Sequence, residues 1–161
     1  MTQTPDWLTE GYPELRDAPP WVMQEMIETQ PELLERIATG SDTVALALLL
    51  KGPGPHATVG CGTSEHGSLA VAELLTEAGT PVVSRQAFEA SLEPQAGGVV
   101  IGISHAGETW ATIQAMQAAR AAGSATGLVT AAPNRKASAQ ADAVLATPFE
   151  DRSWCHTIGE V

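Results

Sequence analysis

An almost uninterrupted apolar run at residues 98–103 most constrains the fold of this chain. It reads Gly-Val-Val-Ile-Gly-Ile and has the length of a strand. A strand that is apolar along its whole length is typically covered on both faces, as strands in parallel sheets are. The run therefore predicts a central strand with helices on either side.

The same rhythm of strand, loop and helix recurs along most of the chain. Strands are predicted at 57–61, 81–84, 98–103, 125–130 and 143–146, with helical patterns at 64–78, 86–92 and 108–122 and a short turn near Ser138. Alternating units of this kind imply parallel strands with helices on both sides of the sheet. We therefore predict an α/β fold, a three-layer αβα sandwich around a five-stranded parallel sheet.

Two of the predicted helices carry apolar stripes at helical spacing. The stripes are Val71, Leu74, Leu75 and Ala78 in one helix, and Thr112, Ala115, Met116 and Ala119 in the other. Each stripe is expected to face the sheet.

Three regions are expected along the chain. Residues 1–18 are polar and rich in proline, which favours a poorly ordered N-terminal segment. Residues 19–52 form a helical lead-in, in which Pro31 is expected to end one helix and begin the next. Residues 53–161 form the α/β domain. Because no helical pattern follows the last predicted strand, we expect this domain to be truncated at its C-terminal end.

Charge and composition narrow the possible partners. The formal net charge is −11, which argues against nucleic acid and against a polybasic membrane patch. The two cysteines and four histidines show no metal-ligand spacing, so we expect neither a metal nor a cofactor. The N-terminus shows no signal-peptide pattern, which favours a cytoplasmic protein.

Two segments combine glycine with hydroxyl side chains where a strand is expected to end and a helix to begin. Residues 60–64 read Gly-Cys-Gly-Thr-Ser, and residues 104–109 read Ser-His-Ala-Gly-Glu-Thr. A helix N-terminus presents unpaired N–H groups and attracts anions, and hydroxyl groups add donors. In parallel sheets such loops meet at the carboxyl ends of the strands, so the two segments predict one anion pocket.

These segments resemble a known family, the SIS (sugar isomerase) domain. Residues 60–64 match its G-C-G-T-S loop, and residues 104–109 resemble its S-Q-S-G-E-T phosphate loop. Residues 21–31 resemble its helical lead-in, and similarity extends to Ala141-Asp142 and to 150–157. The resemblance covers roughly residues 19–161. It is strongest to the first half of the isomerase domain of glucosamine-6-phosphate synthase and to related aminosugar-phosphate isomerases and deaminases.

The resemblance implies a flavodoxin-like SIS fold and a set of residues that bind a sugar phosphate. These are Gly62, Thr63, Ser64, Ser104, His105, Gly107, Glu108 and Thr109. His105 stands where the family usually has Gln, and Ala106 stands where it usually has Ser. The second change removes a hydroxyl donor, which His105 could replace by donating.

Several residues near these loops have simpler interpretations. Cys61 is expected to be a small packed residue, because no basic partner precedes it. Glu108 is more simply explained as a carboxylate stabilised in the first helical turn than as a general base. Trp110 and Trp154 could shield a sugar from water, but core packing is favoured.

The implied function is phosphosugar binding by half of an aldose–ketose isomerase or a deaminase. The family's proton-moving groups lie in or after a second half, so no catalytic residue can be named here. We do not expect this chain on its own to act as a glutamine amidotransferase, because it begins Met1-Thr2 and shows no glutaminase domain. The alternative is a non-catalytic module that senses a sugar phosphate. An unrelated nucleotide-binding protein is less favoured, since no G-x-G-x-x-G follows the first strand. The resemblance implies pairing as a homodimer or with a tandem second half.

Overall fold

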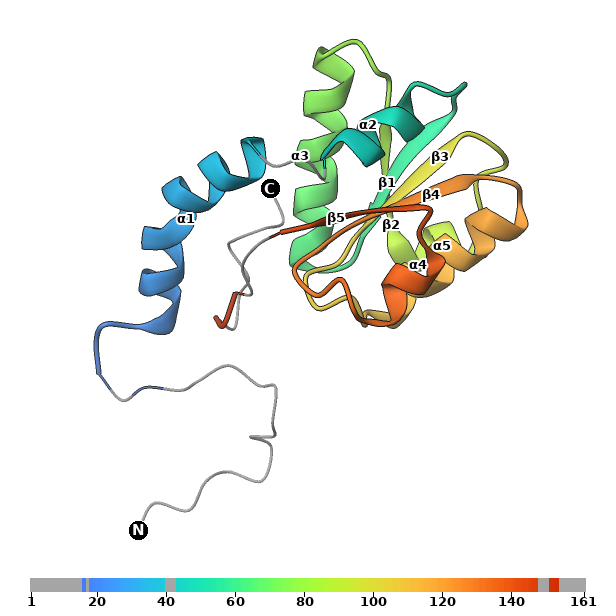
Figure 1. Cartoon of the computed structure of the whole chain (residues 1–161). Coiled ribbons are helices and arrows are strands. Elements are labelled where there is room, and N and C mark those ends of the chain that lie inside the picture. Colours follow the sequence, from blue (N-terminus) through green and yellow to red (C-terminus); the bar gives the residue numbers. More distant parts are fainter. Residues whose placement is uncertain (1–15, 17, 40–42, 148–150, 154–161) are drawn as a thin grey trace.

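The computed structural model describes residues 16, 18–39, 43–147 and 151–153. Five parallel strands form one sheet in the order β2-β1-β3-β4-β5 (Figure 1). The strands are β1 His56–Gly60, β2 Val83–Gln86, β3 Val99–Ile103, β4 Ala125–Thr130 and β5 Ala143–Ala146. The helices are α1 Val22–Ala38, α2 Thr43–Leu50, α3 Thr63–Glu77, α4 Ala87–Leu92 and α5 Trp110–Ala121, with a 3-10 helix, η1, at Lys136–Gln140. The predicted α/β class and five-stranded parallel sheet are confirmed.

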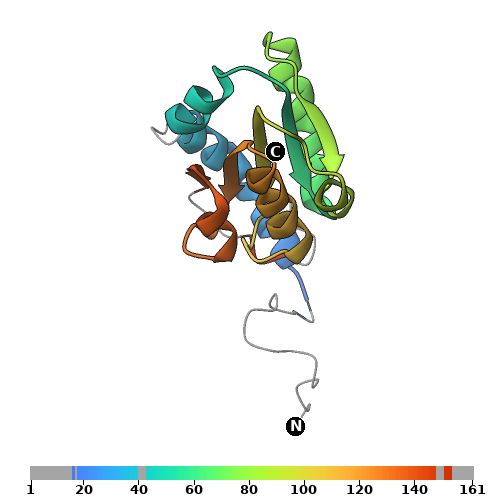
Figure 2. The same cartoon turned by 90° about the vertical axis from the view of Figure 1, so that its right-hand side faces the viewer.

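Helices cover both faces of the sheet, as the apolar strand required (Figure 2). On one face, small side chains of α4 and α5 pack against β1 and β3. This cluster consists of Ala57, Val59, Ala87, Ala90, Val100, Ala111, Ala115 and Ala119. Alanine side chains let these helices approach the sheet closely. The predicted stripe of α5 is confirmed, since Thr112, Ala115, Met116 and Ala119 are all buried.

The predicted stripe of α3 is confirmed only in part. The residues that α3 buries are Ser64, Gly67, Ser68 and Ala72, whereas the Leu74 side chain is 60% exposed and Ala78 lies beyond the helix. Small residues prevail because α3 lies against β1, where the Thr58 hydroxyl donates to the Ser68 carbonyl at 2.9 Å. Large side chains on this face of α3 would push the helix away from the strand.

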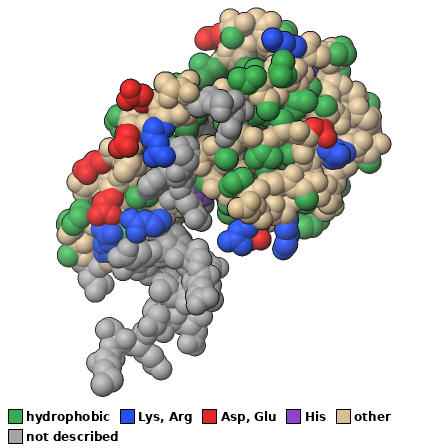
Figure 3. Space-filling view, in the orientation of Figure 1, with side chains coloured by type: hydrophobic (Ala, Val, Ile, Leu, Met, Phe, Trp, Pro, Cys, Tyr) green, Lys and Arg blue, Asp and Glu red, His purple; other side chains and the backbone are tan. Residues whose placement is uncertain are grey.

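Val71 and Leu75, the other two residues of that stripe, line an apolar cavity. The cavity has a volume of about 250 Å³ and lies between α2, α3 and the carboxyl half of β3, β4 and β5. Hydrophobic side chains gather on this side of the molecule (Figure 3). Thr147 lies in the wall, and its buried hydroxyl contacts no hydrogen-bonding partner in the part of the chain that the structure describes.

The predicted break at Pro31 is wrong, because α1 runs without interruption from Val22 to Ala38. An internal proline removes one helical hydrogen bond and costs about 3 kcal/mol. Burial on both sides of the proline offsets this cost, since Met26 before it and Leu33 after it belong to one buried cluster. The hydroxyl of Thr29 also donates to the Met26 carbonyl at 2.7 Å.

Other predictions fall outside the described residues. Most of the N-terminal segment and most of the 150–157 segment belong to this group. Among the helices that the structure describes, none is both long and apolar enough to cross a bilayer. The described residues contain no group of three or more histidine, cysteine or acidic side chains placed to hold a metal ion.

Candidate functional site

The two glycine-rich segments follow neighbouring strands. Strand β1 pairs in parallel with β3, with Val59 opposite Gly102. Since both strands run in the same direction, the β1 loop (residues 60–64) and the β3 loop (residues 104–109) leave the sheet at the same carboxyl edge. The strand order thus confirms the placement on which the predicted anion pocket depends.

The β1 loop makes a tight turn from strand to helix. Gly62 adopts a φ of 65°, in the left-handed region that favours glycine, and α3 begins at the next residue. At Gly60 a side chain would collide with the backbone carbonyl of Ser64. Ser64 is buried in the first turn of α3, while Thr63 is exposed. The loop therefore brings the N-terminus of α3 directly onto the end of β1.

The β3 loop is fixed by its own backbone at Gly107. The Gly107 amide donates to the Ser104 carbonyl at 3.2 Å, and the Gly107 carbonyl accepts from the Ala137 amide at 2.9 Å. Gly107 has a φ of 64°, and a Cβ atom there would lie 3.0 Å from the Ala132 carbonyl oxygen. Both conformation and space therefore favour glycine at this position.

His105 is held at its carbonyl and at its ring. Its carbonyl accepts from the Thr130 hydroxyl and the Ala131 amide, each at 3.1 Å. Its ring atom Nε2 accepts from the Asp151 amide at 3.0 Å, and the side chain is buried. Because Nε2 accepts, the ring proton lies on Nδ1 and the imidazole is neutral in this arrangement. The donation by the His105 ring that was predicted from the sequence is not available at Nε2.

The β3 loop carries several donors around the start of α5. The buried Ser104 hydroxyl donates to the Thr109 hydroxyl oxygen at a long 3.4 Å. Thr109 precedes α5 but makes no capping bond with its side chain. Within the residues that the structure describes, no acceptor contacts the amides of Ala106, Glu108 or Thr109. Together with the N-terminus of α5, these groups form an arrangement able to hold an anion.

The remaining residues near the loops are placed as follows. Glu108 is exposed, and its carboxylate lies 3.8 Å from the Arg135 guanidinium, so its charge is partly compensated. Cys61 packs against the α4–α5 cluster, which confirms the prediction for that residue. Trp110 is 61% exposed, so the prediction that it packs in the core is wrong. It lies beside Phe88 instead, with ring centroids 6.3 Å apart.

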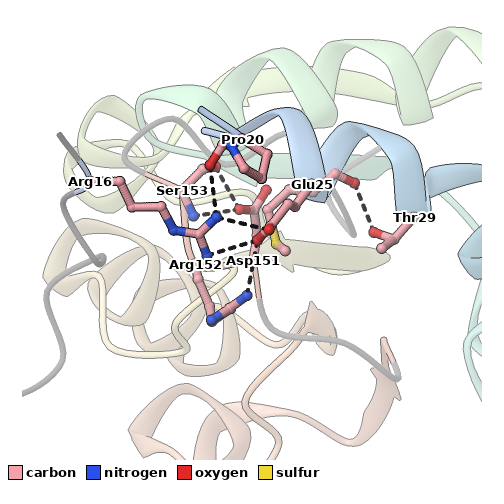
Figure 4. Close-up of polar contacts among 8 residues, drawn as sticks. Arg16, Pro20, Glu25, Thr29, Asp151, Arg152 and Ser153 are labelled. Atoms are coloured by element: carbon pink, nitrogen blue, oxygen red, sulfur yellow. Dashed lines mark hydrogen bonds and ion pairs between the residues drawn. The ribbon is translucent and has the colours of Figure 1, made fainter. Parts of the chain in front are cut away.

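A network of polar contacts that the sequence did not indicate joins residues 151–153 to the start of α1 (Figure 4). The carboxylate of Asp151 accepts from the Ser153 amide at 2.7 Å and from its hydroxyl at 2.5 Å. The guanidinium of Arg152, the residue between Asp151 and Ser153, lies 3.6 Å from the carboxylate of Glu25 in α1. Arg16 donates to both carboxylate oxygens of Glu25, at 2.8 and 2.9 Å. The hydrogen bond from Arg16 lowers the pKa of Glu25, and Arg152 lowers it further.

No protein-family model and no curated protein matches this sequence, but solved structures do. One is a protein of Salmonella typhimurium LT2 to which sugar binding has been ascribed, with 28% identity and a TM-score of 0.66 over 81% of this chain and 43% of that one. Another is the glucosamine-6-phosphate deaminase of Thermotoga maritima, with 18% identity and a TM-score of 0.65 over 81% and 41% of the two chains.

A third similar structure is the C-terminal domain of glucosamine-fructose-6-phosphate aminotransferase from Francisella tularensis. It shows 21% identity and a TM-score of 0.69 over 83% of this chain and 41% of that one. The present chain thus spans about two fifths of the length of these three chains. The sheet order, the two carboxyl-edge loops and these similarities agree, and the chain has the fold of the SIS (sugar isomerase) domain.

Proposed function

We propose that the chain binds a phosphorylated sugar at the carboxyl edge of β1 and β3. The observation that carries this proposal is the β3 loop. Its backbone is fixed at Gly107, while the amides of Ala106, Glu108 and Thr109 contact no acceptor among the residues that the structure describes. Preorganised donors are suited to a charged group, because no rearrangement is needed when the ligand arrives. A phosphate ester has several oxygen atoms that can accept at once.

The two loops would divide the ligand between them. Ser104 and Thr109 would donate their hydroxyl groups to the phosphate. The backbone amides of Ala106, Glu108 and Thr109 would donate beside them. From the β1 loop, Gly62, Thr63 and Ser64 would supply backbone donors and hydroxyls to the phosphate or the sugar. The N-terminus of α5 adds the positive end of the helix dipole.

The acidic character of the protein opposes an anionic ligand at long range but not at contact. With a net charge of −11, the long-range field opposes an anionic ligand. Exposed charges are screened over about 8–10 Å at physiological ionic strength, whereas hydrogen bonds act at contact. Affinity would therefore depend on the loop geometry and respond weakly to added salt.

The activity of the neighbouring structures suggests the chemistry. The chain would act as half of an aminosugar- or ketose-phosphate isomerase or a deaminase in the cytoplasm, completed by a second copy or a second half that supplies the general base. The alternative is a module that binds the sugar phosphate without converting it. The same loops serve both, so binding is the proposal that the site supports directly.

Thermal unfolding with a panel of ligands tests the proposal. Fructose 6-phosphate or glucosamine 6-phosphate should raise the melting temperature, and unphosphorylated fructose should not. Flavin mononucleotide tests the nucleotide alternative. A response to the flavin alone would overturn the proposal, while release of ammonia or aldose–ketose conversion would favour the enzyme over the sensing module.

A further inference from the structure

The 151–153 segment touches both the β3 loop and α1. On the side of the segment that faces the β3 loop, the Asp151 amide donates to Nε2 of His105 at 3.0 Å. Its conformation is fixed by the Asp151 carboxylate, which accepts twice from Ser153. Its outer side directs Arg152 toward Glu25 of α1 (Figure 4). Asp151 and Ser153 are buried, although both are polar.

We propose that the 151–153 segment is a positioning element that fixes the β3 loop through the His105 ring, and that Glu25 of α1 fixes this segment in turn through Arg152. His105, Asp151 and Glu25 are then positioning residues rather than ligand-binding side chains. The consequence for ligand affinity rests on the proposed function, but the effect on the loop does not.

The first step concerns His105 and the amides that follow it. Its carbonyl is held by Thr130 and Ala131 at the end of β4, and its ring is held by Asp151. Because the carbonyl and the ring of His105 are both held, the amide of the next residue, Ala106, points in a fixed direction. Release of the ring would remove one of these two constraints and loosen the loop. A binding site loses affinity when its donors must be ordered by the ligand.

The second step concerns Glu25. Arg16 makes two parallel hydrogen bonds to this carboxylate, which fix its orientation. The Arg152 guanidinium lies 3.6 Å from Oε2 of Glu25, one of the two oxygens that Arg16 binds. The segment is therefore attached to a carboxylate that cannot rotate freely. Since Glu25 lies in the first turn of α1, the start of the helical lead-in is connected to the β3 loop by polar contacts.

Two variants of His105 test the first step in the ligand-free chain. His105→Gln can place an acceptor near the position of Nε2, whereas His105→Leu cannot. We expect the Asp151 amide to exchange its hydrogen about tenfold faster in His105→Leu than in the wild type, with His105→Gln close to the wild type. The amide chemical shifts of Ala106, Glu108 and Thr109 should follow the same order. Equal exchange and unchanged loop shifts in all three proteins would overturn the proposal.

The wild-type protein provides a second signature that needs no variant. Nitrogen NMR at neutral pH should show His105 with a protonated Nδ1 and an unprotonated Nε2. The resonance can be assigned by its absence in His105→Gln. A protonated Nε2 would overturn the proposal even if His105→Leu failed to fold.

A matched pair on α1 tests the second step. Glu25→Gln weakens the contacts to Arg16 and Arg152, while Glu28→Gln, one turn further along, removes a carboxylate that accepts only from Gln24 among the described contacts. We expect Glu25→Gln to raise the exchange rate of the Asp151 amide about two- to threefold, because the pair is partly exposed. Glu28→Gln should leave it unchanged. Equal behaviour of the two variants would show that α1 does not hold the segment.

Titration with fructose 6-phosphate separates this proposal from the proposed function. If the wild type binds and His105→Leu binds about tenfold more weakly than His105→Gln, the proposed function and the positioning role of the 151–153 segment are both supported. If no form binds any sugar phosphate, the proposed function fails, and the exchange rates and loop shifts still decide whether the segment positions the loop.

Discussion

The hydroxyl groups of Ser104 and Thr109 lie 3.4 Å apart, one at the end of β3 and the other at the start of α5. The turn at Gly107 brings them together, because its amide bonds back to the Ser104 carbonyl. Neither hydroxyl caps the helix that follows. The pair is therefore placed to donate to one shared ligand atom or to two oxygens of one group.

Replacing Ser104 with alanine should weaken binding of fructose 6-phosphate. A hydrogen bond to a charged group contributes about 1.5–3 kcal/mol, so the dissociation constant should rise roughly 10- to 100-fold. Calorimetric titration measures it. Ser91→Ala is the control, because the Ser91 hydroxyl donates to the Phe88 carbonyl within α4. Equal affinity in Ser104→Ala and the wild type would place the phosphate elsewhere.

Alanine at Gly107 should destabilise the fold more than alanine at Gly123. Both glycines have positive φ, at 64° and 87°, and a left-handed conformation costs a non-glycine residue about 1–2 kcal/mol. A Cβ atom at Gly107 would also crowd the Ala132 carbonyl, whereas nothing lies within 4 Å of one at Gly123. Urea unfolding of both variants isolates the effect of crowding. Equal midpoints would show that the β3 loop adapts to a side chain.

Replacing Thr147 with valine should stabilise the protein by about 1 kcal/mol. The substitution removes a buried hydroxyl from the wall of an apolar cavity, where it has no partner among the described residues. Valine at Thr126 should do the opposite. That hydroxyl is fully buried, donates to the Gln140 carbonyl at 2.5 Å and accepts from Arg120 at 3.1 Å. Chemical denaturation compares the two. A loss of stability in Thr147→Val would mean that its hydroxyl has a partner.

Stability should fall at acidic pH through Asp142. Burial alone would raise the pKa of this carboxyl, but hydrogen bonds from Thr126 and the nearby Arg120 guanidinium together hold the pKa below its ordinary value of 3.8. A carboxyl whose pKa is lowered by folding stabilises the protein above its unfolded-state pKa, and this contribution is lost as the pH falls through the folded-state pKa.

The melting temperature of Asp142→Asn should therefore depend less on pH than that of the wild type below about pH 4. The carboxylate is partly exposed, so added salt should reduce the difference between the two proteins. Glu28→Gln serves as a control with an unchanged profile. A parallel acid profile for Asp142→Asn would assign the loss of stability to other carboxylates.

The sequence predicted those parts of the fold that depend on local patterns. The apolar run at 98–103 and the spacing of Ala115, Met116 and Ala119 reflect contacts with the layers directly above and below. The alternation of strands and helices also predicted parallel strands, and with them the placement of both loops at the carboxyl edge. A continuous apolar run and a period of 3.6 residues are signals that a single sequence displays.

The sequence did not predict features that depend on distant contacts. The continuity of α1 through Pro31 depends on burial at Met26 and Leu33, and the inner face of α3 was set by its close approach to β1 rather than by its largest side chains. The bond between Asp151 and His105 joins residues 46 positions apart, and no local pattern indicates it. Propensity is overridden in each case by tertiary packing.

Most donors of the β3 loop that contact no described acceptor belong to the main chain, and every amino acid except proline supplies the same N–H group. Side chains at positions such as 106 and 108 can therefore diverge during evolution while the receptor itself persists. Natural selection must therefore preserve the backbone conformation at this edge, which depends on the few glycines that permit it.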